Sequence, residues 1–135
     1  MGWKDSLEEG AREGGHFESG ESIQAAIVAD SGRPVGGGAP EAGHEVLPIK
    51  KRFALIATER NLYVLGMGLI GFKSVEETVL KVPIAEAEVT SHALGGKVFV
   101  GQRGEKPQWD LNLSGLRNRP KKVISYLEAH AGNAA

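Results

Sequence analysis

The residues of this sequence with the clearest spacing for chemistry are three glycines in one short stretch. Gly66, Gly68 and Gly71 of "YVLGMGLIGF" have the G-x-G-x-x-G spacing that lets a backbone approach the pyrophosphate of a dinucleotide. Such a site needs a strand before the glycines, a helix directly after them and an acidic residue roughly 20 positions further on. Leu62–Leu65 is strand-like, and Glu86 has the required separation. One hypothesis is therefore a dinucleotide-binding enzyme.

The segment after the glycines favours a loop between two strands instead. It reaches Pro83 after only about ten residues and is rich in valine and threonine, which are typical of strands. Glu86 falls inside an alternating strand pattern and not at the end of a strand. We therefore predict that the glycines form the turn of a β-hairpin, with Leu69 and Ile70 at its tip, and that no cofactor binds there.

No other residue type has the spacing of a reactive site. The chain has no cysteine, its 4 histidines lack the spacing of a metal site, and no serine lies in a G-x-S-x-G context. The acidic pairs Glu76/Glu77 and Glu86/Glu88 are expected on solvated faces, where carboxylate pKa values change little. We predict no catalytic residue and no metal site, and hence no enzyme.

Composition and charge indicate a single small domain. The chain has 135 residues, of which 19 are glycine. Residues 1–50 carry 4 Lys/Arg against 9 Asp/Glu, a net charge of −5, whereas residues 51–135 carry 12 against 8, a net charge of +4. This mild excess lacks the basic stripe of a nucleic-acid-binding protein, so no nucleic acid is expected. The sequence shows neither a signal peptide nor a membrane span, which predicts a cytoplasmic protein.

The elements that must position these residues are predicted to be short strands. Apolar runs bounded by turn residues occur in residues 22–30, 52–66, 77–92 and 93–113, and Pro83 interrupts the third of them. A stripe of apolar residues near every third or fourth position predicts a helix from Arg119 to Ala131. About seven strands followed by one helix predict an antiparallel β-barrel that the helix caps.

The remaining segments are predicted to have little regular structure. Residues 1–20 are expected to form a tail with at most one or two helical turns, because four glycines weaken a helix there. Residues 31–48 are rich in glycine and proline and predict a long flexible loop within a domain of residues 21–131. Residues 132–135 are expected to be a disordered tail.

Several of these segments resemble the bacterial PH-like (pleckstrin homology-like) domain family. The similar segments are "ALIATERNLYVL", the glycine loop ending in "GFK", "ETVLKVPIAEAEV" and "WDLNLSGLRNRPKKVISYLEA", within roughly residues 22–129. The matching positions are Thr58, Arg60, Leu62, Tyr63 and Val64 in the hairpin and Val82, Pro83, Ile84 and Ala87 at the strand break. The resemblance implies a PH-like barrel and carries no catalytic residues.

Candidate binding residues lie in a basic cluster and in the glycine loop. Eukaryotic PH domains use basic residues near early loops to bind phosphoinositides, so the resemblance implies that Lys50, Lys51 and Arg52 could face anionic lipid or phosphate. The alternative is that they are solvated charges that protect the neighbouring apolar strands from aggregation. Leu69 and Ile70, if exposed, would be a contact surface for a partner or a membrane.

The sequence thus predicts a non-enzymatic PH-like binding or scaffolding module that contacts an unidentified protein partner. The contact is expected at an exposed strand edge or in the groove beside the C-terminal helix. Two alternatives stay open. The first is an adaptor at an anionic membrane surface or phosphate that uses Lys50, Lys51 and Arg52, and the second is a dinucleotide-binding enzyme.

Overall fold

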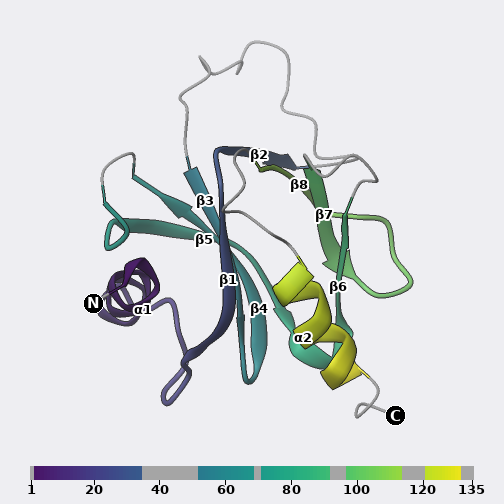
Figure 1. Cartoon of the computed structure of the whole chain (residues 1–135), viewed down its shortest axis with the longest axis horizontal. Coiled ribbons are helices and arrows are strands. Elements are labelled where there is room, and N and C mark those ends of the chain that lie inside the picture. Colours follow the sequence, from purple (N-terminus) through teal and green to yellow (C-terminus); the bar gives the residue numbers. More distant parts are fainter. Residues whose placement is uncertain (1, 35–51, 69–70, 92–96, 114–120, 132–135) are drawn as a thin grey trace.

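The computed structural model describes residues 2–34, 52–68, 71–91, 97–113 and 121–131. Within these ranges the chain is mainly β, with two antiparallel sheets and a C-terminal helix (Figure 1). In chain order the elements are α1 (Trp3–Glu13), β1 (Ile23–Ala29), β2 (Ser31–Pro34), β3 (Arg52–Thr58), β4 (Asn61–Met67), β5 (Val75–Pro83), a 3-10 turn (Ile84–Glu86), β6 (Ala87–Ser91), β7 (Lys97–Gln102), β8 (Trp109–Asn112) and α2 (Lys121–Ala131).

The strands divide into two four-stranded sheets. Sheet A has the order β1-β3-β4-β5 and sheet B the order β2-β8-β7-β6, and every pairing within them is antiparallel. The chain passes from sheet A to sheet B twice, at Asp30 and at the 3-10 turn that follows Pro83. The predicted strand break at Pro83 is confirmed, and it marks a change of sheet.

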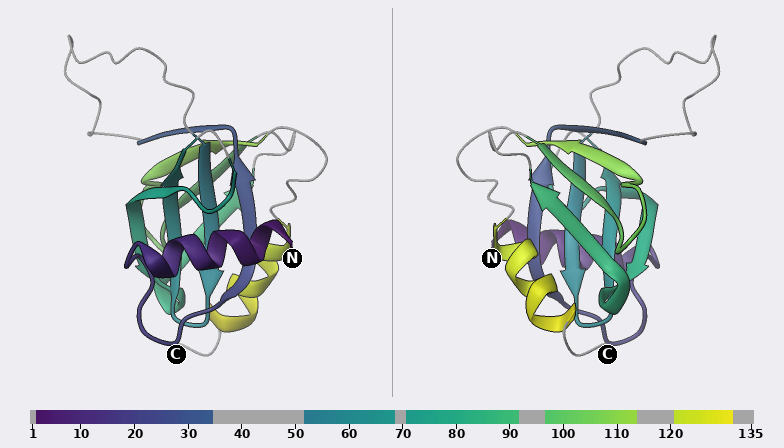
Figure 2. Two further views of the ribbon diagram at one scale, coloured as in Figure 1. Left: turned by 90° about the vertical axis from the view of Figure 1, so that its left-hand side faces the viewer. Right: turned by 90° about the vertical axis from the view of Figure 1, so that its right-hand side faces the viewer.

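The two sheets are not closed into the barrel that the sequence predicted. Among the strands that the structure describes, no strand of sheet A pairs with a strand of sheet B. The chain turns where it passes from one sheet to the other, so the strand pairing of sheet A does not continue into sheet B. Helix α2 lies across the opening and contacts β1 of sheet A and β6 of sheet B (Figure 2). The long loop predicted for residues 31–48 also differs from the structure, because its first residues, Ser31–Pro34, form β2 and pair with β8.

One hydrophobic core lies between the two sheets. Leu55 and Val64 face it from sheet A, and Val98 and Leu111 face it from sheet B, each without exposed surface. Val123 of α2 completes it at the opening. The apolar stripe predicted for the C-terminal helix therefore faces this core.

A second hydrophobic core covers the outer face of sheet A. Helix α1 lies across this face (Figure 2). Its Leu7 and Ala11 pack in one cluster with Ile56, Tyr63 and Leu65. Strand β4 is buried along its whole length and β3 along all but its first residue, because sheet B covers one face and α1 the other. Such strands read as continuous apolar runs, as these do.

Helix α1 is longer than the one or two turns expected from the sequence. It has 11 residues, and Gly10, which weakens the helix intrinsically, lies where the helix meets the β4–β5 connection. A Cβ at Gly10 would lie 2.1 Å from the carbonyl oxygen of Lys73. This glycine permits a close approach between backbones, and tertiary packing then stabilises the helix.

The three glycines of the opening motif lie in a β-hairpin. Gly66 is in β4, opposite Phe53 of β3 and Glu77 of β5, and the Gly68 N–H donates to the Ser74 carbonyl oxygen at 2.9 Å. Gly71 has a φ of 71°, which favours glycine. The chain continues as strand β5, so the segment after the glycines supplies no helix N-terminus for a pyrophosphate.

Candidate functional site

Of the five binding residues predicted from the sequence, the structure describes Arg52. Lys50, Lys51, Leu69 and Ile70 lie outside the described residues. The half-buried Arg52 is the first residue of β3, beside the end of β4.

The Arg52 guanidinium holds the β4–β5 connection. Its Nε and Nη2 donate to the Gly68 carbonyl oxygen at 3.0 and 2.7 Å, and Nη2 also donates to the carbonyl oxygen of Gly71. The guanidinium carbon lies 5.2 Å from the centroid of the Phe72 ring. Three of the five N–H donors of this side chain are therefore directed at the protein's own loop and not at an external phosphate.

A hollow of about 210 Å³ lies between α2 and β6. Its apolar lining comes from the inward side of β6 and from α2, where Val89 and Leu127 are nearly buried and Ile124 is half-buried. Exposed Glu88, Glu128 and Arg103 form its charged rim. Its lining residues are Ala87, Glu88, Val89, Thr90, Arg103, Ile124, Leu127 and Glu128.

Among the strands that the structure describes, β6 has no partner on the side opposite β7, and this edge borders the hollow. It is the last strand of sheet B, and its register with β7 is unbroken from Ala87 to Ser91. The Arg103 N–H donates to the Glu86 carbonyl oxygen at 2.7 Å in the same register. In an antiparallel ladder every second residue of a strand bonds to its partner strand, so the N–H and C=O of Val89 point away from β7. Helix α2 lies on that side of β6 (Figure 2).

A second hollow, of about 520 Å³, lies on the other side of α2, against β1. Its lining residues are Gln24, Ala25, Lys121, Lys122, Ser125 and Tyr126. Lys121 and Lys122 are exposed, and the Tyr126 ring is half-buried. The charged residues that border the two hollows differ: two glutamates and Arg103 border the first, and two lysines border the second.

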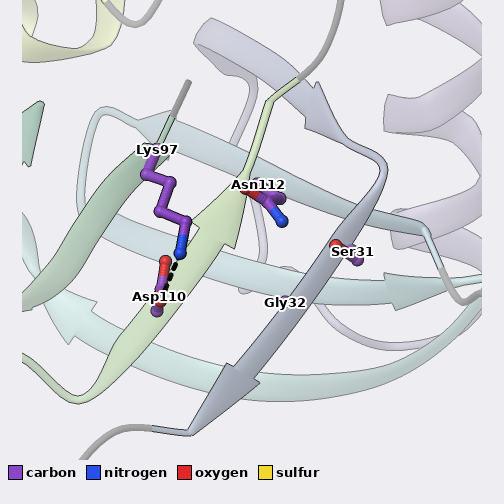
Figure 3. Close-up of a pocket in the computed structure, with 5 residues that line it drawn as sticks. All are labelled: Ser31, Gly32, Lys97, Asp110 and Asn112. Carbon is purple, nitrogen blue, oxygen red and sulfur yellow. Dashed lines mark ion pairs between the residues drawn. The ribbon is translucent and has the colours of Figure 1, made fainter. Parts of the chain in front are cut away.

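A third hollow, of about 220 Å³, lies on sheet B and holds an internal ion pair (Figure 3). Lys97 Nζ lies 3.8 Å from Oδ2 of the buried Asp110, with Ser31 and Asn112 beside them. An ion pair offsets part of the cost of burying a carboxylate.

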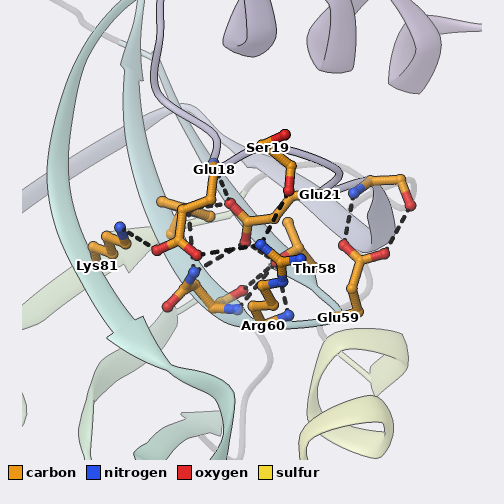
Figure 4. Close-up of polar contacts among 10 residues, drawn as sticks. Glu18, Ser19, Glu21, Thr58, Glu59, Arg60 and Lys81 are labelled. Atoms are coloured by element: carbon orange, nitrogen blue, oxygen red, sulfur yellow. Dashed lines mark hydrogen bonds and ion pairs between the residues drawn. The ribbon is translucent and has the colours of Figure 1, made fainter.

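The most buried polar cluster is a clamp on one carboxylate, that of Glu21 (Figure 4). Its Oε2 accepts hydrogen bonds from the Thr58 hydroxyl and from Asn61 Nδ2, the latter at 3.0 Å. Its Oε1 accepts from the Tyr63 hydroxyl and from the Glu18 N–H, the latter at 2.6 Å. This Glu21 clamp ties the segment after α1 to the β3–β4 turn.

Hydrogen bonds to the Glu21 carboxylate determine its ionisation state. Burial raises the pKa of Glu21, but the hydrogen bonds from Thr58, Tyr63, Glu18 and Asn61 together bring it below its ordinary value. Burial, followed by the nearby Glu21 carboxylate, raises the pKa of the Tyr63 phenol. Glu21 is therefore ionised at neutral pH, and because it has no exposed surface its role is structural.

Two of the four histidines fall within the described residues, and both contact neighbouring groups. His16 Nδ1 is 2.7 Å from the Thr78 hydroxyl, and His130 Nδ1 is 2.8 Å from the Tyr126 carbonyl oxygen. In the part of the chain that the structure describes, no three histidine or acidic side chains are grouped as metal ligands. None of its helices is long and apolar enough to cross a membrane.

The comparisons with known proteins assign the chain to no family. No model of a known protein family matches this sequence, and no curated protein sequence is significantly similar to it.

Proposed function

We propose that this protein is a PH-like binding module that holds an extended segment of a partner protein in the groove between β6 and α2. It acts by binding alone. The observation that carries the proposal is the regular edge of β6, which has no partner among the described strands and lies beside a hollow with an apolar lining. Two antiparallel sheets followed by a helix across their opening support a PH-like fold.

An added strand would use both the backbone and the side chains of this groove. The N–H and C=O of Val89 offer main-chain hydrogen bonds to an antiparallel or parallel partner strand. Because alternate residues of a strand point the same way, every second side chain of the partner would contact Ile124 and Leu127. The rim carries two negative charges, Glu88 and Glu128, against one positive charge, Arg103, and this balance favours lysine or arginine at its other positions.

The experiment begins with a library of random peptides displayed on phage and selected on the whole protein. Selected peptides are then titrated into the isotope-labelled protein, and the shifted amide resonances are mapped. We expect the largest shifts in Ala87–Ser91 and in α2. Shifts confined to other elements would contradict the proposal.

A proline variant tests the role of the main chain. Val89→Pro removes the N–H that faces the groove and keeps the N–H groups that pair with β7. Because Val89 also belongs to the core, its folding is checked by circular dichroism. Peptide affinity should fall about tenfold or more, which is the scale of one lost hydrogen bond and its unsatisfied partner. Thr90→Ala is the control, because it changes an exposed side chain of the same strand and keeps its backbone. Equal affinities of a folded Val89→Pro variant and the wild type would refute strand addition.

A further inference from the structure

The strands at the ends of the two sheets differ in how their outer edges are protected. Bulges, proline, charge and short length protect such edges, because an unprotected edge can pair with another chain. Strands β1 and β5 each break register with the neighbouring strand, and β2 has four residues and ends in Pro34. Strand β6 has five residues in unbroken register and contains neither proline nor lysine. Among the described edge strands, β6 is therefore the one best suited to pair with a second chain.

The outer edge of β6 presents main-chain groups in a symmetric arrangement. The N–H and C=O of Val89 point away from β7, and by the same alternation so do those of Ala87 and Ser91. An antiparallel strand could form a pair of main-chain hydrogen bonds at each of these three residues. Because the three lie symmetrically about Val89, a second β6 related by a two-fold rotation offers the same groups at the same spacing.

The exposed side chains of β6 select one register for such a pairing. With the two-fold axis at Val89, Glu88 lies opposite Thr90 of the second copy, so each carboxylate lies beside a hydroxyl that can donate a hydrogen bond. With the axis at Glu88, two glutamates would face each other directly, which is destabilising. With the axis at Thr90, the second β6 would pair with only the last three residues of the strand, Val89–Ser91. The axis at Val89 uses the whole strand and brings no like charges opposite each other.

We infer that the free protein forms a two-fold symmetric dimer in which two copies of Ala87–Ser91 pair antiparallel, with the axis at Val89. Sheet B then continues from one copy into the other. The inference rests on the β6 edge of the proposed function and adds its regulation, because a partner segment must displace the second copy. A pairing of five residues a side is smaller than a standard interface, so the dimer dissociates on dilution and dilute protein exposes the edge.

The test uses cysteine cross-linking, because the wild-type chain contains no cysteine. The variants Glu88→Cys and Thr90→Cys are mixed at high concentration and oxidised. In the inferred register their thiols lie opposite each other in a non-hydrogen-bonded pair, where the Cα atoms are about 4.5 Å apart and a disulfide can form. Two copies of the same cysteine lie on a diagonal, about 7–8 Å apart, which is too far for a disulfide. We expect the mixture to give several-fold more cross-linked dimer than either variant alone.

The control is a mixture of Glu76→Cys and Thr78→Cys, which has the same spacing on the β5 edge and should cross-link little. Equal cross-linking in all of these samples would overturn the inference. The disulfide-linked dimer of Glu88→Cys and Thr90→Cys should also bind a selected peptide much more weakly than the same protein after reduction. Equal binding before and after reduction would overturn the regulation of the groove by the dimer.

The charge of residue 90 tests the same register without a cross-link. Thr90→Lys places an ammonium group opposite Glu88 of the second copy, and Thr90→Glu places a carboxylate there, each twice in the dimer. Sedimentation equilibrium should show a dimer about fivefold tighter for Thr90→Lys and about fivefold weaker for Thr90→Glu, the scale of two exposed cross-strand charge pairs. Because Thr90 is exposed, both variants should keep the fold, which circular dichroism checks.

Ser125→Lys and Ser125→Glu are the charge controls, because they make the same changes in net charge at an exposed residue of α2 that does not line the β6 groove. Their dimers should stay within about twofold of the wild type. Equal effects at residues 90 and 125 would overturn the inference. A wild-type protein that is monomeric at every concentration, while a selected peptide still shifts the amides of Ala87–Ser91, would overturn the dimer and leave the proposed function standing.

Discussion

The two sheets of this protein differ in what covers their faces and in how their edges are protected. Sheet A lies between α1 and sheet B, and the Glu21 clamp fixes its β3–β4 turn. Its edge strand β5 has nine residues and breaks register with β4 twice, at Val64/Leu65 and at Gly66/Met67. Sheet B ends in β6, which has no such break and faces a hollow.

These differences indicate which edge can accept another strand. Bulges and exposed charges are common devices that prevent an edge strand from pairing with a second chain. Strand β5 has both, with Glu76, Glu77 and Lys81 exposed. Strand β6 keeps a regular ladder and an edge that faces α2. We therefore expect sheet A to contribute most to stability, and we propose that binding occurs at the β6 edge of sheet B.

The largest expected effect comes from removal of the clamp in sheet A. Glu21→Ala would leave the buried hydroxyls of Thr58 and Tyr63 and the Asn61 amide without their shared acceptor. We expect the free energy of unfolding to fall by about 3 kcal/mol, measured by urea denaturation. Glu18→Gln is the control, because Glu18 is exposed and its Oε atoms form ion pairs at the surface. A loss below about 1 kcal/mol for Glu21→Ala would show that the clamp is not important for stability.

The next effect concerns the packing of α1 on sheet A. Gly10→Ala would place a methyl group 2.1 Å from the Lys73 carbonyl oxygen, which is backbone and cannot move away as a side chain could. Although alanine is the better helix former, we expect a loss of about 2 kcal/mol in urea denaturation. Lys4→Ala, on the exposed side of the helix, should change stability little. A Gly10→Ala variant that is more stable than the wild type would contradict the docking of α1.

A smaller effect is the dependence of stability on pH. The folded-state pKa of Glu21 lies below its unfolded value, so its contribution to stability is complete above the unfolded pKa and is lost as the pH falls through the folded pKa. Urea denaturation between about pH 3 and pH 7 should therefore show a steeper acid loss for the wild type than for Glu21→Gln, which cannot titrate. Parallel curves for the two proteins would contradict this assignment.

The smallest expected effect is on peptide affinity, and it compares charge reversal at the β6 edge with charge reversal at the β5 edge. The double variant E88K/E128K reverses the rim of the β6 groove, and E76K/E77K makes the same change in net charge on the β5 edge. Affinity for a selected basic peptide, measured by fluorescence anisotropy, should fall about fivefold for E88K/E128K and less than twofold for E76K/E77K. A larger loss for E76K/E77K would reverse the assignment of the two edges.

Much of the strand order could be predicted from local pattern, but the partners of the strands could not. The apolar runs, the turn before Asn61 and the break at Pro83 are local signals, and they correspond to β3, β4, β5 and β6. That β6 is an edge depends on pairings between distant segments, which no local pattern contains. The continuous apolar runs of β3 and β4 did carry a signal that both faces of these strands are covered. Sheet B covers one face and α1 the other.

The polar residues were harder to predict than the strands. Glu21 is one of several acids in the N-terminal segment, and its side-chain hydrogen-bond partners lie 37 to 42 positions away in the sequence. Arg52 was grouped with Lys50 and Lys51 by charge, whereas its role depends on two carbonyl oxygens that the β4–β5 connection brings beside it. In both cases the fold supplies the partner, and residue type alone does not.

The most direct test of the central claim is hydrogen exchange of the Val89 amide with and without a selected peptide. If the peptide adds as a strand to β6, exchange of the Val89 N–H should slow by at least about tenfold, because a new main-chain hydrogen bond protects it, while the outward amides of β5 keep their rates. Protection at β5 with no change at Val89 would contradict the claim.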